Sequence, residues 1–173
     1  PMDTPHIVTK SYQGAMSSIR ALISRLYPVV QNYNLYSGLV TLVEALQSLR
    51  VEEMSISLDI PDTNVSYPPE IEVHLFRIIQ HACQNAIQHS RAGAVHISGD
   101  IRPQSVEISV SDDGVGFNAP DEINLPTLLH DHYFGLASMY ERAELIGADF
   151  KIETAPNRGC RVSIAWQSHP DEF

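Results

Sequence analysis

The residues best suited to ligand chemistry form an acidic, glycine-rich corner with the sequence SDDGVGF at positions 111–117. It follows residues 106–110, where apolar and polar residues alternate as in a half-buried strand. Gly114 and Gly116 allow the backbone to turn tightly and to approach a ligand with no Cβ in between. The carboxylate of Asp113 precedes them and can accept hydrogen bonds from an exocyclic amine. Ordinary turns use the same residues, so this corner alone leaves a ligand site and a plain turn equally open.

A second group of polar residues lies on one face of a helix predicted for residues 68–90. His81, Asn85 and His89 are spaced four residues apart and therefore share a face. Asparagine offers a hard oxygen ligand to Mg²⁺, and water and phosphate can fill the other positions. This face is suited to form one side of a site that holds Mg²⁺ and phosphate. The alternative interpretation is a polar helix face that is exposed to solvent. A neighbouring apolar stripe would pack on a sheet: Leu75, Ile79, Ala82 and Ala86.

Two further glycine-containing segments stand where a helix or a strand begins. Gly135 and Leu136 open a predicted helix after a long loop, and a helix N-terminus offers free N–H donors to phosphate. The segment 157–160, with Gly159 and Cys160, enters the last predicted strand. Each segment alone is compatible with a cap or a turn. The four features together, in this order along the chain, favour a phosphate-bearing ligand.

The periodicity along the chain predicts the elements that position these residues. The pattern favours an α/β fold, an α+β two-layer sandwich with a mixed, largely antiparallel sheet covered on one face by helices. Residues 1–50 are predicted as a helical segment interrupted near residues 28–34, and residues 51–173 as the main domain. The first segment is either a helix packed on that domain or the tail of a dimerising helical hairpin. Strands are predicted at 51–60, 95–101, 106–110, 150–154 and 161–166, a second long helix at 135–146, and an irregular loop between 118 and 134.

The composition limits the classes of partner. The chain has 173 residues with a formal net charge of −10 and 43% hydrophobic residues, enough for one domain with a real core and a modest extension. Such a charge argues against nucleic acid and anionic membrane surfaces as partners. A polyanionic ligand therefore requires local compensation from Mg²⁺, backbone N–H groups and a few cations.

The two cysteines, Cys83 and Cys160, are expected to be unpaired thiols of a reducing compartment. No apolar run reaches the roughly 20 residues of a membrane span, so the chain is expected to be cytoplasmic, whatever anchor a longer protein carries.

Over residues 51–167 the chain resembles the catalytic, ATP-binding domain of two-component sensor histidine kinases, within the group shared with gyrase, the Hsp90 chaperones and MutL. Four ordered motifs carry the resemblance: IIQHACQNAIQHS (78–90) for the N box, SDDGVGF (111–117), FGLASMYERAELIG (134–147) and NRGCRVSI (157–164) for the glycine boxes. The resemblance implies a Bergerat-type ATP-binding fold. It is closest to the branch that partners response regulators with a LuxR-type output, and residues 23–46 look like the end of that branch's dimerisation region.

The resemblance also implies roles for the site residues. On the adenine side, Asp113 is expected to accept from the N6 amine, with Gly114, Gly116 and Gly159 shaping the pocket and Cys160 standing where threonine is usual. On the phosphate side, the implied residues are Asn85 as the Mg²⁺ ligand, His89 near the phosphates, Gly135 and Leu136 bordering them, and residues 118–134 as a lid over the nucleotide. ATP and Mg²⁺ are thus the implied cofactors.

Two departures from the family pattern bear on catalysis. His81 stands where the N box of this branch has glutamate, the expected base, one helical turn before Asn85. An imidazole can accept a proton but has no negative charge to hold a Mg²⁺-bound water, so we expect ATP binding to be intact and transfer to be weakened or altered. Tyr133 stands in place of the first glycine of the second glycine box.

The phosphoacceptor is expected outside this chain. His6 is the one histidine before the ATPase-like region, and no acidic residue follows it as in the family's acceptor. The implied partners are dimerisation helices that carry the acceptor histidine, a response regulator and, in the whole protein, a second copy of the chain. Two alternatives stay open: an anti-sigma-factor serine kinase, and a degenerate nucleotide-binding module that works through partner contacts.

Overall fold

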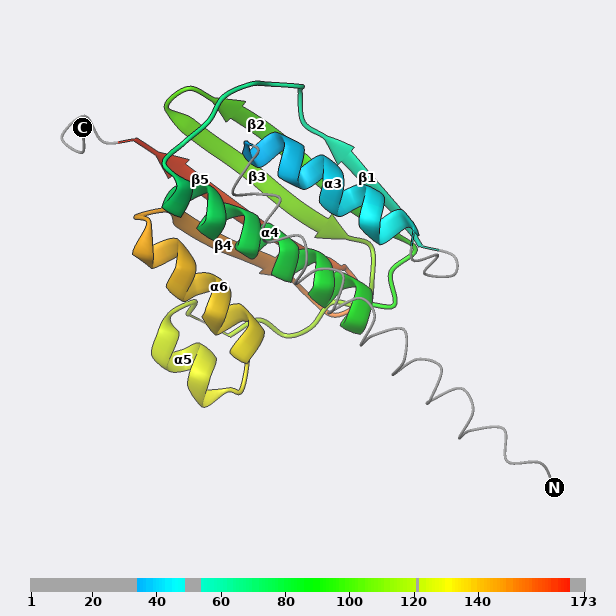
Figure 1. Ribbon diagram of the computed structural model, residues 1–173. Coiled ribbons are helices and arrows are strands. Elements are labelled where there is room, and N and C mark those ends of the chain that lie inside the picture. The colour runs from blue at the N-terminus through cyan, green and yellow to red at the C-terminus, as the bar shows by residue number, and fades with distance from the viewer. Residues whose placement is uncertain (1–33, 49–53, 121, 169–173) are drawn as a thin grey trace.

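The computed structural model describes residues 34–48, 54–120 and 122–168. Within them the chain forms one five-stranded sheet and four helices (Figure 1). Their order is α3 (Leu35–Ser48), β1 (Ser55–Asp59), α4 (Pro69–His89), β2 (Ala94–Arg102), β3 (Ser105–Asp112), α5 (Leu125–His130), α6 (Phe134–Leu145), β4 (Asp149–Thr154) and β5 (Cys160–Gln167).

The sheet has the strand order β1-β2-β3-β5-β4. The β1–β2 pair is parallel and the other three pairs are antiparallel, which confirms the predicted mixed, largely antiparallel sheet. The helices α3, α4 and α6 lie on one side of it (Figure 1). The predicted α/β two-layer architecture is therefore confirmed.

Side-chain alternation along β3 decides which residues face the helices. Val106, Ile108 and Val110 are buried in the core, whereas Glu107 is exposed and Ser109 is partly exposed on the opposite face. Because side chains point to alternating faces of a strand, the even-numbered positions of β3 all turn toward the helices. The register pairs Val110 with Val162 and Asp112 with Cys160, so the end of β3 and the start of β5 lie side by side beneath α4.

The long helix α4 begins where the sequence predicts. Pro69 stands in its first turn, where the missing N–H costs no intrahelical hydrogen bond, and Glu70 and Glu72 complement the helix dipole. The apolar stripe that includes Leu75 and Ile79 is buried on the sheet. The helix ends at His89, and its C-cap residue, Ser90, lies beside the acidic corner and accepts from the Val115 N–H at 2.7 Å.

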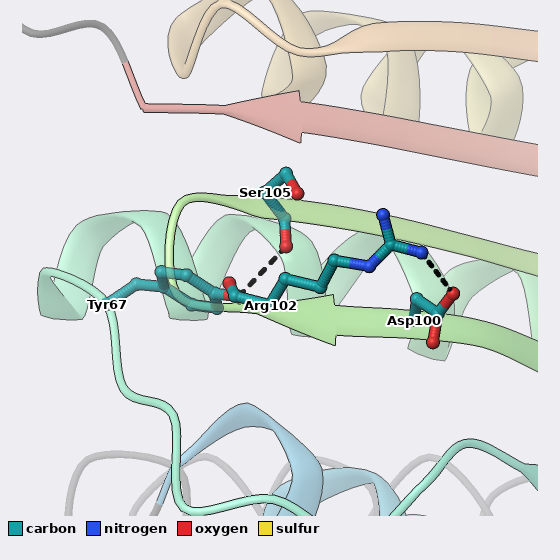
Figure 2. Close-up of polar contacts among 4 residues, drawn as sticks. All are labelled: Tyr67, Asp100, Arg102 and Ser105. Atoms are coloured by element: carbon teal, nitrogen blue, oxygen red, sulfur yellow. Dashed lines mark hydrogen bonds and ion pairs between the residues drawn. The ribbon is translucent and has the colours of Figure 1, made fainter.

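A tyrosine fixes the start of α4 to the far end of the sheet. The hydroxyl of Tyr67 lies within hydrogen-bond distance of the carbonyl oxygens of Arg102 and Ser105 at the β2–β3 turn, at 3.2 Å for the latter (Figure 2). Its ring packs edge-on against Trp166, with the centroids 5.2 Å apart, and its N–H donates to a carboxylate oxygen of Glu72 at 3.0 Å. These contacts join the segment just before α4 to the β2–β3 turn and to β5.

The helix α3 packs on the sheet domain. Leu35, Leu39, Leu42 and Leu46 are almost fully buried in the same core as the sheet, and the Gln47 side-chain amide donates to the carbonyl of Ile56 at 2.7 Å. The core thus continues across the boundary predicted at residue 50. Residues 1–33 lie outside the described residues, so a dimerisation region there stays a prediction.

The loop predicted between 118 and 134 contains the short helix α5, which the sequence did not reveal. The Asn124 side chain caps it by accepting from the N–H of Thr127 at 2.9 Å, and Leu128 is completely buried. A helix of six residues has too few turns to show a periodicity. Within the described part of the chain, no helix has the length and apolar character needed to cross a bilayer.

Candidate functional site: a glycine-lined cavity under α4

A cavity of about 340 Å³ lies between α4, the adjoining ends of β3 and β5, and the segment that leads into α6. This volume falls within the usual range of small-molecule sites. The floor is apolar, and polar groups stand at both ends. The lining residues are Ala82, Asn85, Ala86, His89, Ser90, Val110, Asp112, Gly116, Phe117, His132, Tyr133, Phe134, Gly135, Leu136, Cys160 and Val162.

Glycines let three backbone segments meet at the acidic corner. A Cβ on Gly116 would lie 2.1 Å from the carbonyl oxygen of Ala155, and one on Gly159 would lie 2.0 Å from that of Asp112. Both glycines have left-handed φ values, +57° and +67°, which other residues adopt at a cost. A Cβ on Gly114 would overlap Ser90 at 2.3 Å. The predicted glycine corner therefore requires glycine, although only Gly116 of the three lines the cavity.

At this corner the structure places a different carboxylate in the cavity from the one predicted. The side chain of Asp113 accepts from the N–H groups of Gly93 (2.8 Å) and Ala94 (2.9 Å) and lies outside the cavity. Asp112 lines the cavity instead. The reason is strand alternation, because Asp112 shares the parity of Val110 and turns toward the helices, while Asp113 follows the opposite face.

The surroundings of Asp112 have opposing effects on the pKa of its carboxyl group. Burial raises its pKa above the ordinary value, and the nearby Asp113 carboxylate adds to the increase. Hydrogen bonds from the backbone N–H groups of Gly114 (2.9 Å) and Cys160, and from the Ser90 side chain, act in the opposite direction. Asp112 is thus an oriented acceptor at the end of an apolar cavity, well placed to receive an N–H group of a ligand.

At the other end of the cavity, α4 meets the start of α6. A Cβ on Gly135 would lie 3.4 Å from the side-chain oxygen of Asn85, so the amide stands against the first turn of α6. The first N–H groups of a helix have no intrahelical partner and can serve an anion. No cluster of three or more His, Cys, Asp or Glu side chains suited to a metal occurs among the described residues. The Asn85 amide offers one hard oxygen, a type of ligand that suits Mg²⁺, an ion that usually takes its other ligands from phosphate and water.

Residues 70–170 match the model of the family described as the histidine kinase-, DNA gyrase B- and HSP90-like ATPases. The chain belongs to this ATPase family. Among its relatives, the sensor protein VraS of Staphylococcus saprophyticus is 33% identical over 91% of this chain, and the sensor histidine kinase LiaS of Bacillus subtilis is 31% identical over the same share. The chain spans 43% and 41% of the length of these two relatives.

Solved structures share the fold of this ATPase domain. The histidine kinase domain of the blue-light activated histidine kinase EL346 of Erythrobacter litoralis aligns with a TM-score of 0.65 and 17% identity, over 92% of this chain and 81% of that one. The ATP-binding domain of PrrB from Mycobacterium tuberculosis aligns with a TM-score of 0.52 and 24% identity, over 72% of this chain and 88% of that one. These likenesses support the Bergerat-type architecture expected from the sequence.

Most of the site residues predicted for the ATPase domain come together in one cavity. Asn85, His89, Gly116, Gly135, Leu136 and Cys160 line it. Gly114 and Gly159 stand behind the lining, joined by a hydrogen bond of 2.8 Å from the Gly159 N–H to the Gly114 carbonyl. Asp113 and His81, the other two predicted residues, also do not line it.

The thiol of Cys160 faces the cavity next to Asp112. Burial and the Asp112 carboxylate raise its pKa to about 11, although the Thr154 side chain acts in the opposite direction. Thr154 also links the corner to β5, because its hydroxyl donates to the Gly159 carbonyl at 2.8 Å and accepts from the Phe117 N–H at 3.1 Å. Cys160 is therefore a neutral, weakly polar wall at ordinary pH. Both cysteines are free thiols, as predicted.

His81 lies in the seam between α4 and α6 rather than in the cavity of the ATPase domain. Burial lowers its pKa, and the positive charges of Arg142 and Arg77 lower it further. Its Nδ1 is buried and has no hydrogen-bond partner among the described residues. His81 is thus a neutral imidazole one helical turn from Asn85.

Several residues that line the cavity were not among the predicted site residues, and they include aromatic ones. Phe117 and Tyr133 pack with ring centroids 5.5 Å apart, and the Tyr133 hydroxyl donates to the carbonyl of Asn118 at 3.0 Å. The left-handed backbone conformation that favours glycine occurs at His132 (φ +63°), one residue before the Tyr133 that was predicted to replace a glycine. An irregular segment offers no periodicity from which such positions can be predicted.

Proposed function

We propose that this cavity binds Mg·ATP and that the chain is the catalytic domain of a sensor histidine kinase, passing the γ-phosphate to a histidine on a dimerisation helix outside this chain. The observation that carries the proposal is the placement of Asp112. Its carboxylate stands at one end of a glycine-lined cavity, and Asn85 and the start of α6 stand at the other. The family and its named relatives supply independent support.

At the adenine end, Asp112 accepts a hydrogen bond from the exocyclic amine. Gly116 leaves room for the base to approach the backbone, and Val110, Val162 and Cys160 supply the apolar wall beside it. Guanine has a carbonyl oxygen in place of this amine. That oxygen would face the Asp112 carboxylate, and two hydrogen-bond acceptors cannot bond to each other. This arrangement therefore selects adenine over guanine.

At the phosphate end, the Asn85 side-chain oxygen would hold Mg²⁺, and the N–H groups of Gly135 and Leu136 would donate to phosphate oxygens. His89, one turn beyond Asn85, faces the same space. When bound, Mg²⁺ neutralises phosphate charge and orients the triphosphate. This compensation matters because the chain itself carries a net charge of −10.

The chemical step is where this chain departs from the family pattern. A neutral His81 beside Arg142 can accept a proton but cannot hold a Mg²⁺-bound water by charge. We infer slow transfer to the acceptor histidine. A second candidate function, a nucleotide-binding module that acts through partner contacts, is favoured by the position of His81 outside the cavity.

The partners proposed for the whole protein follow from the relatives. These are a second copy of the chain, its dimerisation helices and a response regulator, of the LuxR-type branch by the motif resemblance. An anti-sigma-factor serine kinase is disfavoured because the named relatives are sensor kinases.

Supplying a dimerisation-helix fragment with its acceptor histidine, together with γ-labelled ATP and Mg²⁺, tests the activity. Acid-labile, base-stable label on the fragment, absent with the Asp112→Asn variant, would support the kinase. ATP binding without label would favour the binding module. Absence of ATP binding would contradict both.

A further inference from the structure

The cavity has an unusual charge balance for a site that takes a triphosphate. None of the described residues that line it is lysine or arginine, and Asp112 contributes a carboxylate. The basic side chains that face the space are the imidazoles of His89 and His132. With a net chain charge of −10, cationic or donor groups inside the cavity have to offset the repulsion of a polyanion.

His132 occupies a backbone position that favours glycine. After α5, the N–H of His132 bonds to the carbonyl of Leu129 (3.2 Å), and the N–H of Tyr133 bonds to that of Leu128 (2.8 Å). This is the hydrogen-bond pattern of a Schellman cap, whose left-handed residue is usually glycine. His132 fills it with φ +63°. A side chain there carries a conformational cost, and such strain gathers at functional sites.

The imidazole stands at the phosphate end of the cavity. Its ring lies 5.7 Å from that of Phe134, centroid to centroid, and both residues line the cavity. Three residues later, Gly135 meets the Asn85 amide. His132 is also exposed, so its ring can reach a ligand that enters from solvent.

We propose that His132 is a phosphate-binding residue that donates a hydrogen bond to the β- or γ-phosphate of the bound nucleotide, and that this contact is why an imidazole replaces glycine in the cap. The proposal rests on the proposed ATP site and deepens it. It accounts for the cost of the left-handed histidine and for the lack of lysine and arginine among the described lining residues.

The test is the His132→Gly variant, titrated by calorimetry with adenosine, ADP and ATP in Mg²⁺. Glycine suits the left-handed cap, so the variant should fold with a melting temperature equal to or above that of the unchanged chain. Loss of one charge-assisted hydrogen bond should weaken ATP binding about tenfold; ADP binding should weaken equally if the contact is to the β-phosphate and stay unchanged if it is to the γ-phosphate. Adenosine affinity should stay within about twofold. His132→Asn, which tolerates the same backbone and keeps a donor, should recover part of the loss.

Arg91→Gly is the matched control. Arg91 also has a left-handed φ (+52°), just after α4, but it does not line the cavity. Its loss removes a full positive charge and should change ATP affinity by less than about twofold. Unchanged ATP affinity in His132→Gly, or an equal loss for adenosine and ATP, would overturn the proposal. If the unchanged chain bound no nucleotide, the ATP site itself would be refuted.

Discussion

Exchanging one oxygen for a nitrogen at Asp112 tests the recognition of the nucleotide base. Asp112→Asn keeps the size of the side chain, and its amide oxygen can still accept from the Gly114 N–H, now 2.9 Å from the carboxylate. The variant removes the negative charge, and its NH₂ group, a donor, takes the place of the carboxylate oxygen that would accept from the adenine amine. The corner should therefore fold while its hydrogen bond to an amine is lost.

The size of the effect follows from the bond removed. A hydrogen bond to a charged group contributes about 1.5–3 kcal/mol, and 1.4 kcal/mol is tenfold in affinity, so ATP binding should weaken roughly 10- to 150-fold. Isothermal titration calorimetry with Mg·ATP measures it. The loss should appear equally for adenosine, because the contact is to the base and not to the phosphates.

Stability should move in the opposite direction from affinity. Burial raises the folded-state pKa of Asp112, so the stability that its neutral form contributes is present at acid pH and lost as pH rises through that raised pKa. At pH 7 the carboxylate is ionised at a cost that the amide does not carry. Asp112→Asn should thus be at least as stable as the unchanged chain at pH 7, with the gain shrinking at acid pH, as measured by urea unfolding.

Asp113→Asn is the control one residue away. Its oxygen can still accept from Gly93 and Ala94, so ATP affinity should stay within about twofold of that of the unchanged chain. If Asp113→Asn abolished binding while Asp112→Asn retained it, the reasoning from strand parity would be refuted.

Four other substitutions or reactions test separate parts of the site. Asn85→Ala should weaken ATP binding in Mg²⁺ and leave binding in excess EDTA unchanged; equal loss in both would exclude a metal role. His81→Glu should speed transfer to an acceptor fragment without tightening ATP binding; no gain would mean that His81 does not limit transfer. Gly116→Ala should lose roughly 2–4 kcal/mol in urea unfolding against about 1 kcal/mol for Gly147→Ala, because only the former Cβ meets backbone at 2.1 Å; equal losses would contradict the close approach. Since the pKa of Cys160 is about 11 against an ordinary 9.0, its alkylation at pH 8 should be roughly a hundredfold slower than that of a free thiol, and a rate near that of the free thiol would contradict the burial.

The long elements of the fold were predictable because they carry strong periodic patterns. The alternation of apolar and polar residues predicted β3, and the prolines at its start predicted the beginning of α4. Both elements lie within two residues of their predicted bounds. The helix α5 was not predictable, because it has six residues and is held by Leu128 and an asparagine cap. The packing of α3 on the sheet was one of two open alternatives, since periodicity gives the apolar face of a helix but not the surface that covers it.

The site shows a similar division. The glycine corner and the Asn85 face were found from residue types and spacing. Asp112 could also have been found, because the parity of Val106, Ile108 and Val110 points to it. The burial of His81 against Arg142 could not, since it depends on how α6 crosses α4. His132 is hidden for a related reason, because its left-handed backbone arises from the end of an unpredicted helix.

The affinity of the unchanged chain for ATP, measured by calorimetry with Mg²⁺ and again with EDTA, tests the central claim most directly. The account predicts one saturable site, tighter with Mg²⁺ than without it, that accepts ATP and rejects GTP. Absence of binding under both conditions, or equal affinity for ATP and GTP, would contradict it.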